Sequence, residues 1–251
     1  MATFVYIGTY TAQGKAEGIY VYRMDDASGA LEHVQTVSGL NSPTFLALHP
    51  QQPFLYAVER QGNFEGLNTG AVSAFAVDPA TGHLTLLNRQ PSGGVSPCYV
   101  SVHPSGRHVF AANYVSGHVA ALPIEADGQL GAATDVVQHK GKGPNPQRQA
   151  GPHAHFITPD PAGKYVLACD LGIDQVLVYR WDGAAGQLVP NDPPSARANP
   201  GAGPRHLAFH PSARFVYVLN EIASTLSAFA YDPEHGTLAL LETVSTLPEG
   251  F

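Results

Sequence analysis

The amino-acid sequence repeats with a period of about fifty residues, and this repeat constrains the fold more than any other feature. A hairpin signature, Gly-x-Leu after a turn that carries Asp or Pro, occurs five times, at Gly29, Gly82, Gly128, Gly186 and Gly236. A second signature, a proline that opens a small loop before an apolar run, occurs four times, at Pro50, Pro104, Pro161 and Pro211. Such periods indicate stacked units that bury their faces against their neighbours.

Each unit has the pattern of four antiparallel strands. In the last full copy the strand-like runs lie at 203–209, 215–219, 224–231 and 238–244. The second run, Phe215–Leu219, is aromatic and β-branched, and a turn with Pro and Ser separates it from the first. The sequence therefore predicts an all-β fold, a β-propeller of four-stranded antiparallel blades with about five blades present. A β-sandwich is the alternative, but it does not readily produce a fifty-residue self-similarity.

The two ends of the chain are out of phase with the repeat. Residues 4–10, 18–24 and 31–37 align with second, third and fourth strands, so the first blade lacks its first strand. We expect nineteen strands, three in the first blade and four in each later one. A ring that does not close leaves bare sheet edges, which stable proteins avoid. We therefore expect residues 1–251 to form a single propeller domain that is incomplete, shortened at the C-terminus and without its ring-closing strand.

Composition limits the partners and the location. A net charge of −7 argues against a nucleic-acid partner, because binding the phosphate backbone requires a basic patch. No run of 18 apolar residues is present, and the chain enters a strand at once, so we expect no membrane span and a cytoplasmic location. The two cysteines, Cys98 and Cys169, are expected to be buried apolar side chains rather than a disulfide. The oligomeric state is not predicted.

Three positions of the repeat vary in chemical type while the apolar positions stay apolar. Six residues before the marker proline stand Thr44, Cys98, His155 and Arg205. Nine residues after it stand Glu59, Asn113, Asp170 and Asn220, and ten residues after it stand Arg60, Tyr114, Leu171 and Glu221. Because the first strand of each blade lines the channel, these positions should gather at one mouth, as functional residues do. For Glu59, Arg60 and Asn113 a solvated rim is the alternative.

The candidate catalytic residues are His153, His155, Arg205 and Glu221. The two histidines belong to the segment 151–155, where an extended strand would point both to one face. An imidazole, a guanidinium and a carboxylate at one channel mouth suit acid–base chemistry on an anionic substrate. The alternative for the histidines is a pair that caps a turn.

Other motifs do not predict a bound group. A catalytic zinc requires a third protein ligand, and the recurring histidines His103, His206 and His210 have the pattern of turn residues, so we expect no metal and no cofactor. The segment 140–146 lacks the Gly-Lys-Ser/Thr of a phosphate loop and is interpreted as an insertion between blades, either a lid over the channel or a plain loop. The single Trp181-Asp182 pair is not the repeated signature of WD40 propellers.

Several motifs together resemble the seven-bladed propeller lactonases, a family that includes bacterial 6-phosphogluconolactonases and fungal carboxy-muconate cyclases. The resemblance covers the whole chain and depends on the opening 6–11, on the Ser-Pro and His-Pro starts of the blades, on 151–155, and on 203–206 with 220–221. It implies metal-independent hydrolysis of 6-phospho-glucono-1,5-lactone to 6-phosphogluconate. It also implies a site of a His, an Arg and a Glu matching His153 or His155, Arg205 and Glu221.

The chain departs from that family in length, because seven blades need about 350 residues and a further Arg of the pattern belongs to a later blade. The mechanistic hypothesis is that Glu221 or His155 activates water and Arg205 holds the oxyanion or an anionic group. No Gly-x-Ser-x-Gly segment is present, so a covalent serine intermediate is not expected. The alternatives are a lactonase or cycloisomerase for another carboxylated ring, and a binding scaffold without chemistry.

Overall fold

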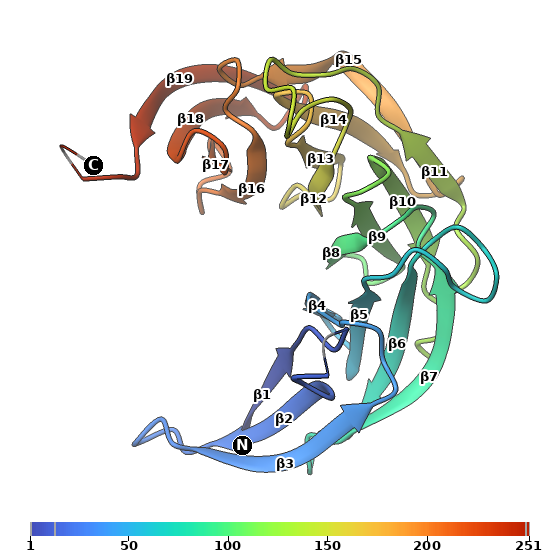
Figure 1. Ribbon diagram of the computed structural model, residues 1–251. Helices are drawn as coiled ribbons and strands as arrows, with labels where there is room; N and C mark the ends of the chain where they lie inside the picture. Colours follow the sequence, from blue (N-terminus) through green and yellow to red (C-terminus); the bar gives the residue numbers. More distant parts are fainter. Residues whose placement is uncertain (1, 13, 249, 251) are drawn as a thin grey trace.

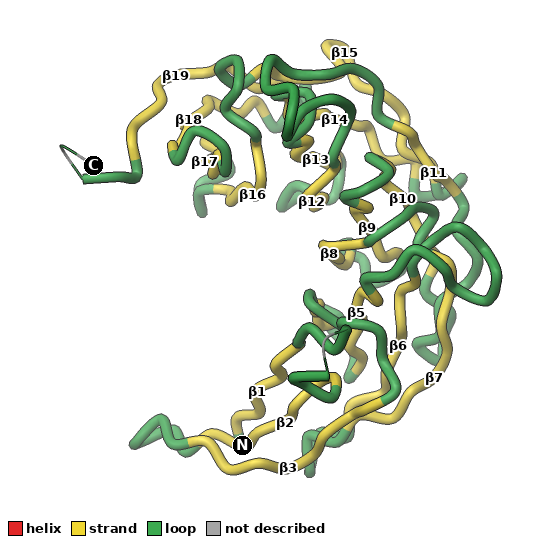
Figure 2. The backbone as a smooth tube through the Cα atoms, in the orientation of Figure 1, coloured by secondary structure: helices red, strands yellow, loops and turns green. Residues whose placement is uncertain are grey.

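The computed structural model describes residues 2–12, 14–248 and 250, and within them it contains strands and loops but no helix (Figure 2). The first sheet has three strands, β1 (Thr3–Gly8), β2 (Gly18–Met24) and β3 (Leu31–Ser38). The second has β4 (Leu46–Leu48), β5 (Phe54–Glu59), β6 (Ala71–Val77) and β7 (Leu84–Pro91). The third has β8 (Pro97–Val102), β9 (His108–Asn113), β10 (His118–Pro123) and β11 (Asp135–Gln138).

The last two sheets repeat this pattern. The fourth has β12 (Ala154–Pro159), β13 (Tyr165–Asp170), β14 (Gln175–Asp182) and β15 (Gln187–Arg197). The fifth has β16 (Pro204–Phe209), β17 (Phe215–Asn220), β18 (Thr225–Asp232) and β19 (Thr237–Ser245). In every sheet each strand pairs antiparallel with the next one along the chain, so the predicted blades are confirmed, and among the described residues the first sheet has three strands, as expected.

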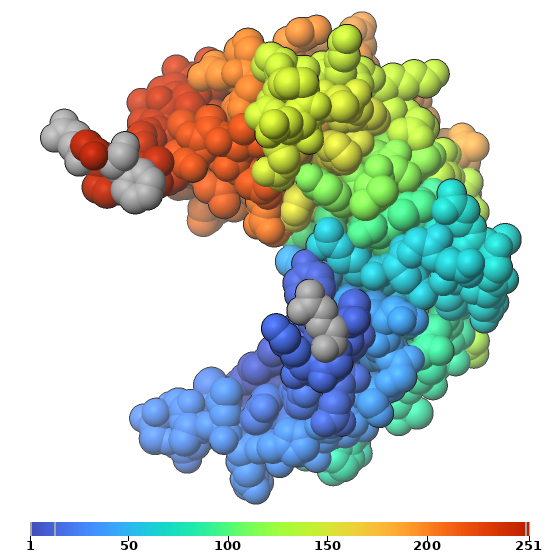
Figure 3. Space-filling model, in the orientation of Figure 1, coloured from blue at the N-terminus to red at the C-terminus, as the bar shows by residue number. Residues whose placement is uncertain are grey.

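The five sheets stand side by side along an arc around a central opening, which confirms the propeller (Figure 1). Strands β4, β8, β12 and β16 lie on the concave inner side, and β3, β7, β11, β15 and β19 form the outer rim. The space-filling view shows the same crescent, hollow on its inner side (Figure 3). The inner strands of neighbouring sheets contact one another, β4 with β8, β8 with β12 and β12 with β16. Residues at equivalent repeat positions are therefore neighbours around the axis.

The core is divided among the gaps between neighbouring sheets. In the described part of the chain, one cluster of buried side chains lies in each of the four gaps. Strand β13 is buried along its whole length because a sheet packs on each of its faces. Strand β17 alternates between buried and exposed residues, with Tyr217 and Leu219 exposed, because only one face of the fifth sheet is covered. Cys98 and Cys169 are free and buried, as expected.

Two physical reasons explain why the repeated hairpin position is a glycine. Its φ angle is positive in every copy, 74° at Gly82, 85° at Gly128 and 66° at Gly236, a region that other residues rarely adopt. In these three copies a Cβ would also overlap an aromatic ring of the preceding sheet, which is Phe4, Phe54 and Tyr165 in turn. The glycine thus closes its own hairpin and lets the sheet before it approach.

The histidine before the marker proline also joins neighbouring sheets. His49 Nε2 lies 2.9 Å from the carbonyl oxygen of Gly106, and His103 Nε2 lies 2.9 Å from that of Gly163. The Nδ1 atoms of His103 and His210 hydrogen-bond their own turns at Ser105 and Ser212. The interpretation of His103 and His210 as turn residues is confirmed.

Candidate active site

Three inner strands begin with a β-bulge at the same position of the repeat. The residue left out of the strand pairing is Cys98 in β8, His155 in β12 and Arg205 in β16. A bulge bends its strand and redirects one side chain, and bulges are common beside active sites. At the variable position six residues before the marker proline, the residue is therefore left out of the regular strand pairing, which redirects its side chain.

Glu221 follows the end of β17 and binds two arginines. Arg205 Nε lies 2.8 Å from Glu221 Oε2, and Arg148 Nη2 donates to Glu221 Oε1. Arg148 belongs to the long connection between β11 and β12, so the fifth sheet and this connection meet at one carboxylate. The side chains of Arg205 and Glu221 are 38% and 31% exposed, which leaves them accessible to a small molecule.

Tyr114 connects the two predicted histidines to this ion-pair network. Its ring stacks on His153, with centroids 4.7 Å apart, and meets His155 edge-on at 5.6 Å. His153 Nδ1 lies 2.9 Å from the Tyr114 carbonyl oxygen, and Arg148 Nη2 lies 3.5 Å from the Tyr114 hydroxyl. Both imidazoles are thus fixed next to the Arg148–Glu221 pair.

The imidazole of His155 is neutral at ordinary pH. Burial, followed by the positive charge of Arg205 and by His206, lowers the pKa of His155 to about 4. Burial and Arg205 likewise lower the pKa of His206 to about 4. Each of these rings keeps one buried nitrogen without a hydrogen-bond partner among the described residues, Nδ1 in His155 and Nε2 in His206.

The carboxylate of Glu221 is ionised, while the neighbouring thiol is not. Desolvation raises the pKa of Glu221, but the hydrogen bond and the charge of Arg148 and the charge of Arg205 outweigh it and lower the pKa overall. Burial raises the pKa of Cys98 to about 12 against the opposing charges of Arg60 and Arg205. Cys98 is therefore a protonated, weakly nucleophilic group in this position.

The structure brings the four predicted residues into one network. Arg205 and Glu221 touch directly, and His153 and His155 join them through Tyr114. Sequence reasoning missed Arg148, although it lies three residues before the Gly151-Pro152-His153 segment. The interpretation of His206 as a turn residue is wrong, because its ring packs at 5.1 Å from the ring of His155.

The position nine residues after the marker proline has a structural role that the sequence did not reveal. Glu59 and Asn113 are 1% and 0% exposed, so the solvated rim is wrong for both. Glu59 accepts from the backbone N–H of Asn41 at 2.9 Å, and Asn113 bonds the hydroxyl and the carbonyl of Ser92 at 2.7 and 2.9 Å. These side chains hold the segment that enters the inner strand of their own blade.

Asp170 performs the same task behind the histidines. Its Oδ1 accepts from the backbone N–H of His153 at 2.8 Å, and its Oδ2 lies 2.6 Å from His139 Nδ1. The other nitrogen of His139 lies 3.0 Å from the Tyr179 hydroxyl, and all three side chains are buried. Buried polar groups must be hydrogen-bonded, and this chain of bonds satisfies them while it fixes the backbone that carries His153.

The connection that carries Arg148 is held at one point by a buried amide. Gln149 is 0% exposed, and its Nε2 donates to the Leu171 carbonyl at 2.9 Å and to Asp174 Oδ1 at 2.7 Å. Asp174 also accepts from the backbone N–H groups of Gly201 and Gly203, just before β16. The segment next to 140–146 is thus tied to the same sheets as Arg205, which favours a fixed loop over a lid.

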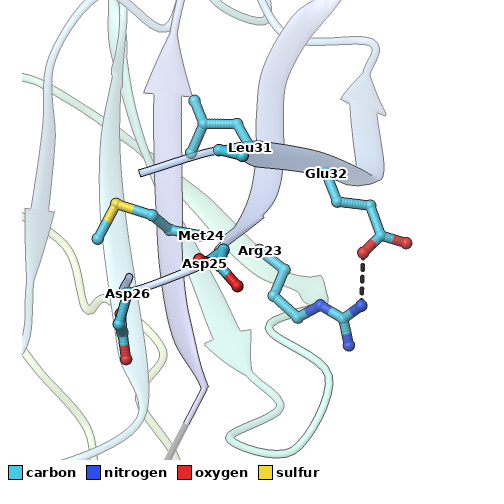
Figure 4. Close-up of a pocket in the computed structure, with 7 residues that line it drawn as sticks. Arg23, Met24, Asp25, Asp26, Leu31 and Glu32 are labelled. Atoms are coloured by element: carbon cyan, nitrogen blue, oxygen red, sulfur yellow. Dashed lines mark hydrogen bonds and ion pairs between the residues drawn. The ribbon is translucent and has the colours of Figure 1, made fainter. Parts of the chain in front are cut away.

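Two further features of the described residues bear on the site. No group of three or more His, Cys, Asp or Glu side chains is placed to hold a metal ion in this part of the chain. A pocket of about 410 Å³ lies at the outer rim, at the turn between β2 and β3 (Figure 4). It is lined by an exposed ion pair, Arg23 with Glu32, and by the hairpin around Asp25. It lacks the buried, perturbed groups of the inner site.

The comparison with known families decides the assignment. Residues 4–251 match the family described as "Lactonase, 7-bladed beta-propeller". The chain belongs to this lactonase family. Among its relatives, the 6-phosphogluconolactonase of Bacillus subtilis is 38% identical over 247 residues, which are 98% of this chain and 67% of the relative. Family membership places the chain among the lactone hydrolases, and the propeller lactonase resemblance is confirmed.

Solved structures of other propeller lactonases agree. The periplasmic gluconolactonase PpgL of Pseudomonas aeruginosa has a TM-score of 0.91 and 34% identity, covering 100% of this chain and 69% of that one. A Bacteroides fragilis protein provisionally described as a 6-phosphogluconolactonase has a TM-score of 0.89 and 34% identity, covering 99% and 68%. The chain thus spans about two thirds of the length of these relatives. No helix among the described residues is long and apolar enough to cross a membrane.

Proposed function

We propose that this lactonase hydrolyses 6-phospho-glucono-1,5-lactone to 6-phosphogluconate, without a metal ion. The observation that carries the proposal is the pair of guanidiniums on Glu221 beside the neutral, buried imidazole of His155. Ester hydrolysis requires a group that takes a proton from water and a positive group for the oxyanion, and these residues supply both. The Bacillus subtilis relative carries the name of this activity.

An excess of positive charge supports an anionic substrate. Arg60 holds the same repeat position as Glu221, so it stands at the same end of the blades. It donates to the hydroxyls of Tyr10 at 2.7 Å and Ser96 at 2.9 Å, and among the described residues it has no acidic partner. Two arginines, Arg148 and Arg205, thus share one carboxylate, and Arg60 adds a third guanidinium at this end of the blades, in a chain whose net charge is −7. A phosphate on the lactone would be attracted to this end of the ring.

The proposed mechanism uses His155 as the base. In the tautomer with its proton on Nε2, the Nδ1 of His155 accepts a proton as the water oxygen bonds to the lactone carbonyl carbon. Arg205 stabilises the resulting oxyanion. When the bond from that carbon to the ring oxygen breaks, His155 returns the proton to the ring oxygen, which becomes a hydroxyl. Glu221 holds Arg148 and Arg205 in place, since each of its carboxylate oxygens is already paired with a guanidinium.

The cytoplasmic location stays a prediction, as does a single domain over residues 1–251. The Pseudomonas aeruginosa relative is described as periplasmic, so family membership does not fix the compartment.

The test is a hydrolysis assay on this chain. The 6-phosphogluconate formed is detected by coupling it to its NADP-dependent dehydrogenase. Spontaneous ring opening is limited by working slightly below neutral pH, and an enzyme-free blank is subtracted. We expect a rate above the blank that EDTA does not change, and a reduction of about 10²-fold in Arg205→Gln. Arg180→Gln, an exposed arginine of β14, is the matched control and should keep full activity. A rate equal to the blank would refute the proposal.

A further inference from the structure

Four rings from four neighbouring sheets pack together on the inner side of the arc. They stand five residues before each marker proline and are Phe45, Tyr99, Phe156 and His206. The centroids of Phe45 and Tyr99 are 4.0 Å apart and those of Tyr99 and Phe156 are 4.2 Å apart. His206 completes the group at 5.3 Å from both Tyr99 and Phe156. We call this group the aromatic floor. Its members Tyr99, Phe156 and His206 directly follow Cys98, His155 and Arg205 in the sequence.

His206 is the exception in this group. The other three blades place a Phe or Tyr at this position, and a ring of carbon atoms would fill the space without needing a polar partner. The Nε2 atom of His206 is instead buried and has no hydrogen-bond partner among the described residues. An unpaired buried polar atom is costly, and native structures rarely keep one without a reason.

A second unpaired nitrogen lies on the adjacent ring. The side chain of His155 is 9% exposed, its Nδ1 also lacks a partner, and its ring centroid is 5.1 Å from that of His206. Packing alone explains neither atom, because no described residue supplies a hydrogen-bond partner to it. Two adjacent imidazoles with unpaired nitrogens, on the inner strands β12 and β16, indicate a binding place for a polar group.

The surroundings select the kind of polar group. Arg205 lies beside both rings and lowers the pKa of each, so a bound cation is disfavoured. A neutral imidazole offers one N–H and one lone pair, which suits a hydroxyl that both donates and accepts. Ligand sites commonly combine an apolar aromatic lining with a few polar atoms that fix orientation, and this is the composition of the floor.

We propose, on the basis of the hydrolase function above, that His206 is a substrate-binding residue whose Nε2 hydrogen-bonds a ring hydroxyl of the lactone. The aromatic floor supports the sugar ring, His155 acts at the carbonyl, and Arg205 directly precedes His206 in the sequence. The ligand class is a polyhydroxylated lactone rather than a plain aliphatic one. A site that binds a hydroxyl in this way discriminates against substrates that lack it.

The first experiment replaces His206 by Phe, which two other blades have at this position, and by Gln. His206→Phe keeps an aromatic floor, since Phe stands at the equivalent position in two blades, and its melting temperature should equal or exceed that of the wild type. We expect kcat/KM for 6-phospho-glucono-1,5-lactone to fall about tenfold, mainly through KM, as loss of one neutral hydrogen bond implies. His206→Gln retains a donor and an acceptor and should recover part of the loss. His210→Gln, a turn residue, is the control.

The second experiment observes contact directly and does not need turnover. Side-chain ¹⁵N shifts of the histidines are recorded with and without the stable product 6-phosphogluconate, and His206→Phe assigns the signal. We expect the Nε2 signal of His206 to shift and the signals of His49 and His210 to stay. If His155 shifts while His206 does not, or if His206→Phe keeps wild-type KM, the proposal is overturned although the hydrolase function stands. Absence of both hydrolysis and product binding would instead refute the proposed function.

Discussion

Two adjacent positions of the repeat, nine and ten residues after the marker proline, have opposite roles. At the first, Glu59, Asn113 and Asp170 are buried and hold the backbone that enters their own blade. At the second, Arg60 and Glu221 are partly exposed, and they bind the Tyr10 hydroxyl and the Arg205 guanidinium. Both positions vary in residue type. Variation within a repeat therefore does not by itself mark a functional site, and burial separates the two roles.

The largest expected effect is on stability and lies at the buried position. Asp170→Asn leaves His139 without its carboxylate and weakens the bond to the His153 backbone, so the free energy of unfolding should fall by about 3 kcal/mol, because buried polar groups lose their hydrogen-bond partners. Denaturant unfolding at neutral pH measures the change. A variant with wild-type stability would show that the buried position is not a structural one.

The next effect is on activity and lies at the exposed position. In Glu221→Gln the neutral amide no longer holds Arg148 and Arg205 by charge, so kcat/KM should fall about 10²-fold. Stability should change by less than about 1 kcal/mol because the pair is solvent-accessible. If the comparison holds, Asp170→Asn loses mainly stability and Glu221→Gln loses mainly activity. If both variants lose the same property, the comparison is wrong.

A smaller effect is expected at Arg60, which shares the exposed position. Arg60→Gln should raise KM for the phosphorylated lactone about tenfold, as expected for the loss of one charge-assisted bond, and leave kcat unchanged. KM for glucono-1,5-lactone, which has no phosphate, should stay the same. Equal changes for both lactones would mean that Arg60 supports the fold rather than binding the phosphate.

The remaining prediction is the pH dependence of stability that arises from the two buried imidazoles. The folded-state pKa of His155 and of His206 is about 4, below the value of about 6.5 for an unfolded chain. The unfolded state therefore binds more protons between these values, and stability should fall as pH drops from about 6.5 to about 4. Thermal melting across this range measures the slope, which should be shallower in His206→Phe. A slope identical to the wild type would contradict the neutral state of His206.

The sequence predicted the blades and the four candidate residues because the repeat aligns positions that stack around an axis. It could not separate the two adjacent polar positions, since Asp170 and Glu221 look alike until burial is known. Arg148 was missed because it lies in a connection outside the repeat, placed by the buried amide of Gln149. His206 was missed because its role depends on which atoms its ring leaves unpaired, and residue spacing does not reveal that.

The fit between a hairpin glycine and an aromatic ring of the preceding sheet recurs in three of the five blades. Phe54 and Tyr165 stand four residues after their marker prolines, and each lies over a glycine of the following sheet. Phe215 stands at the same point of the fifth sheet, whose far face carries Tyr217 and Leu219 in contact with solvent. A β-sheet that joined this face in the manner of the contacts at Phe54 and Tyr165 would present a glycine opposite Phe215, so this contact would restrict the sequence of its partner.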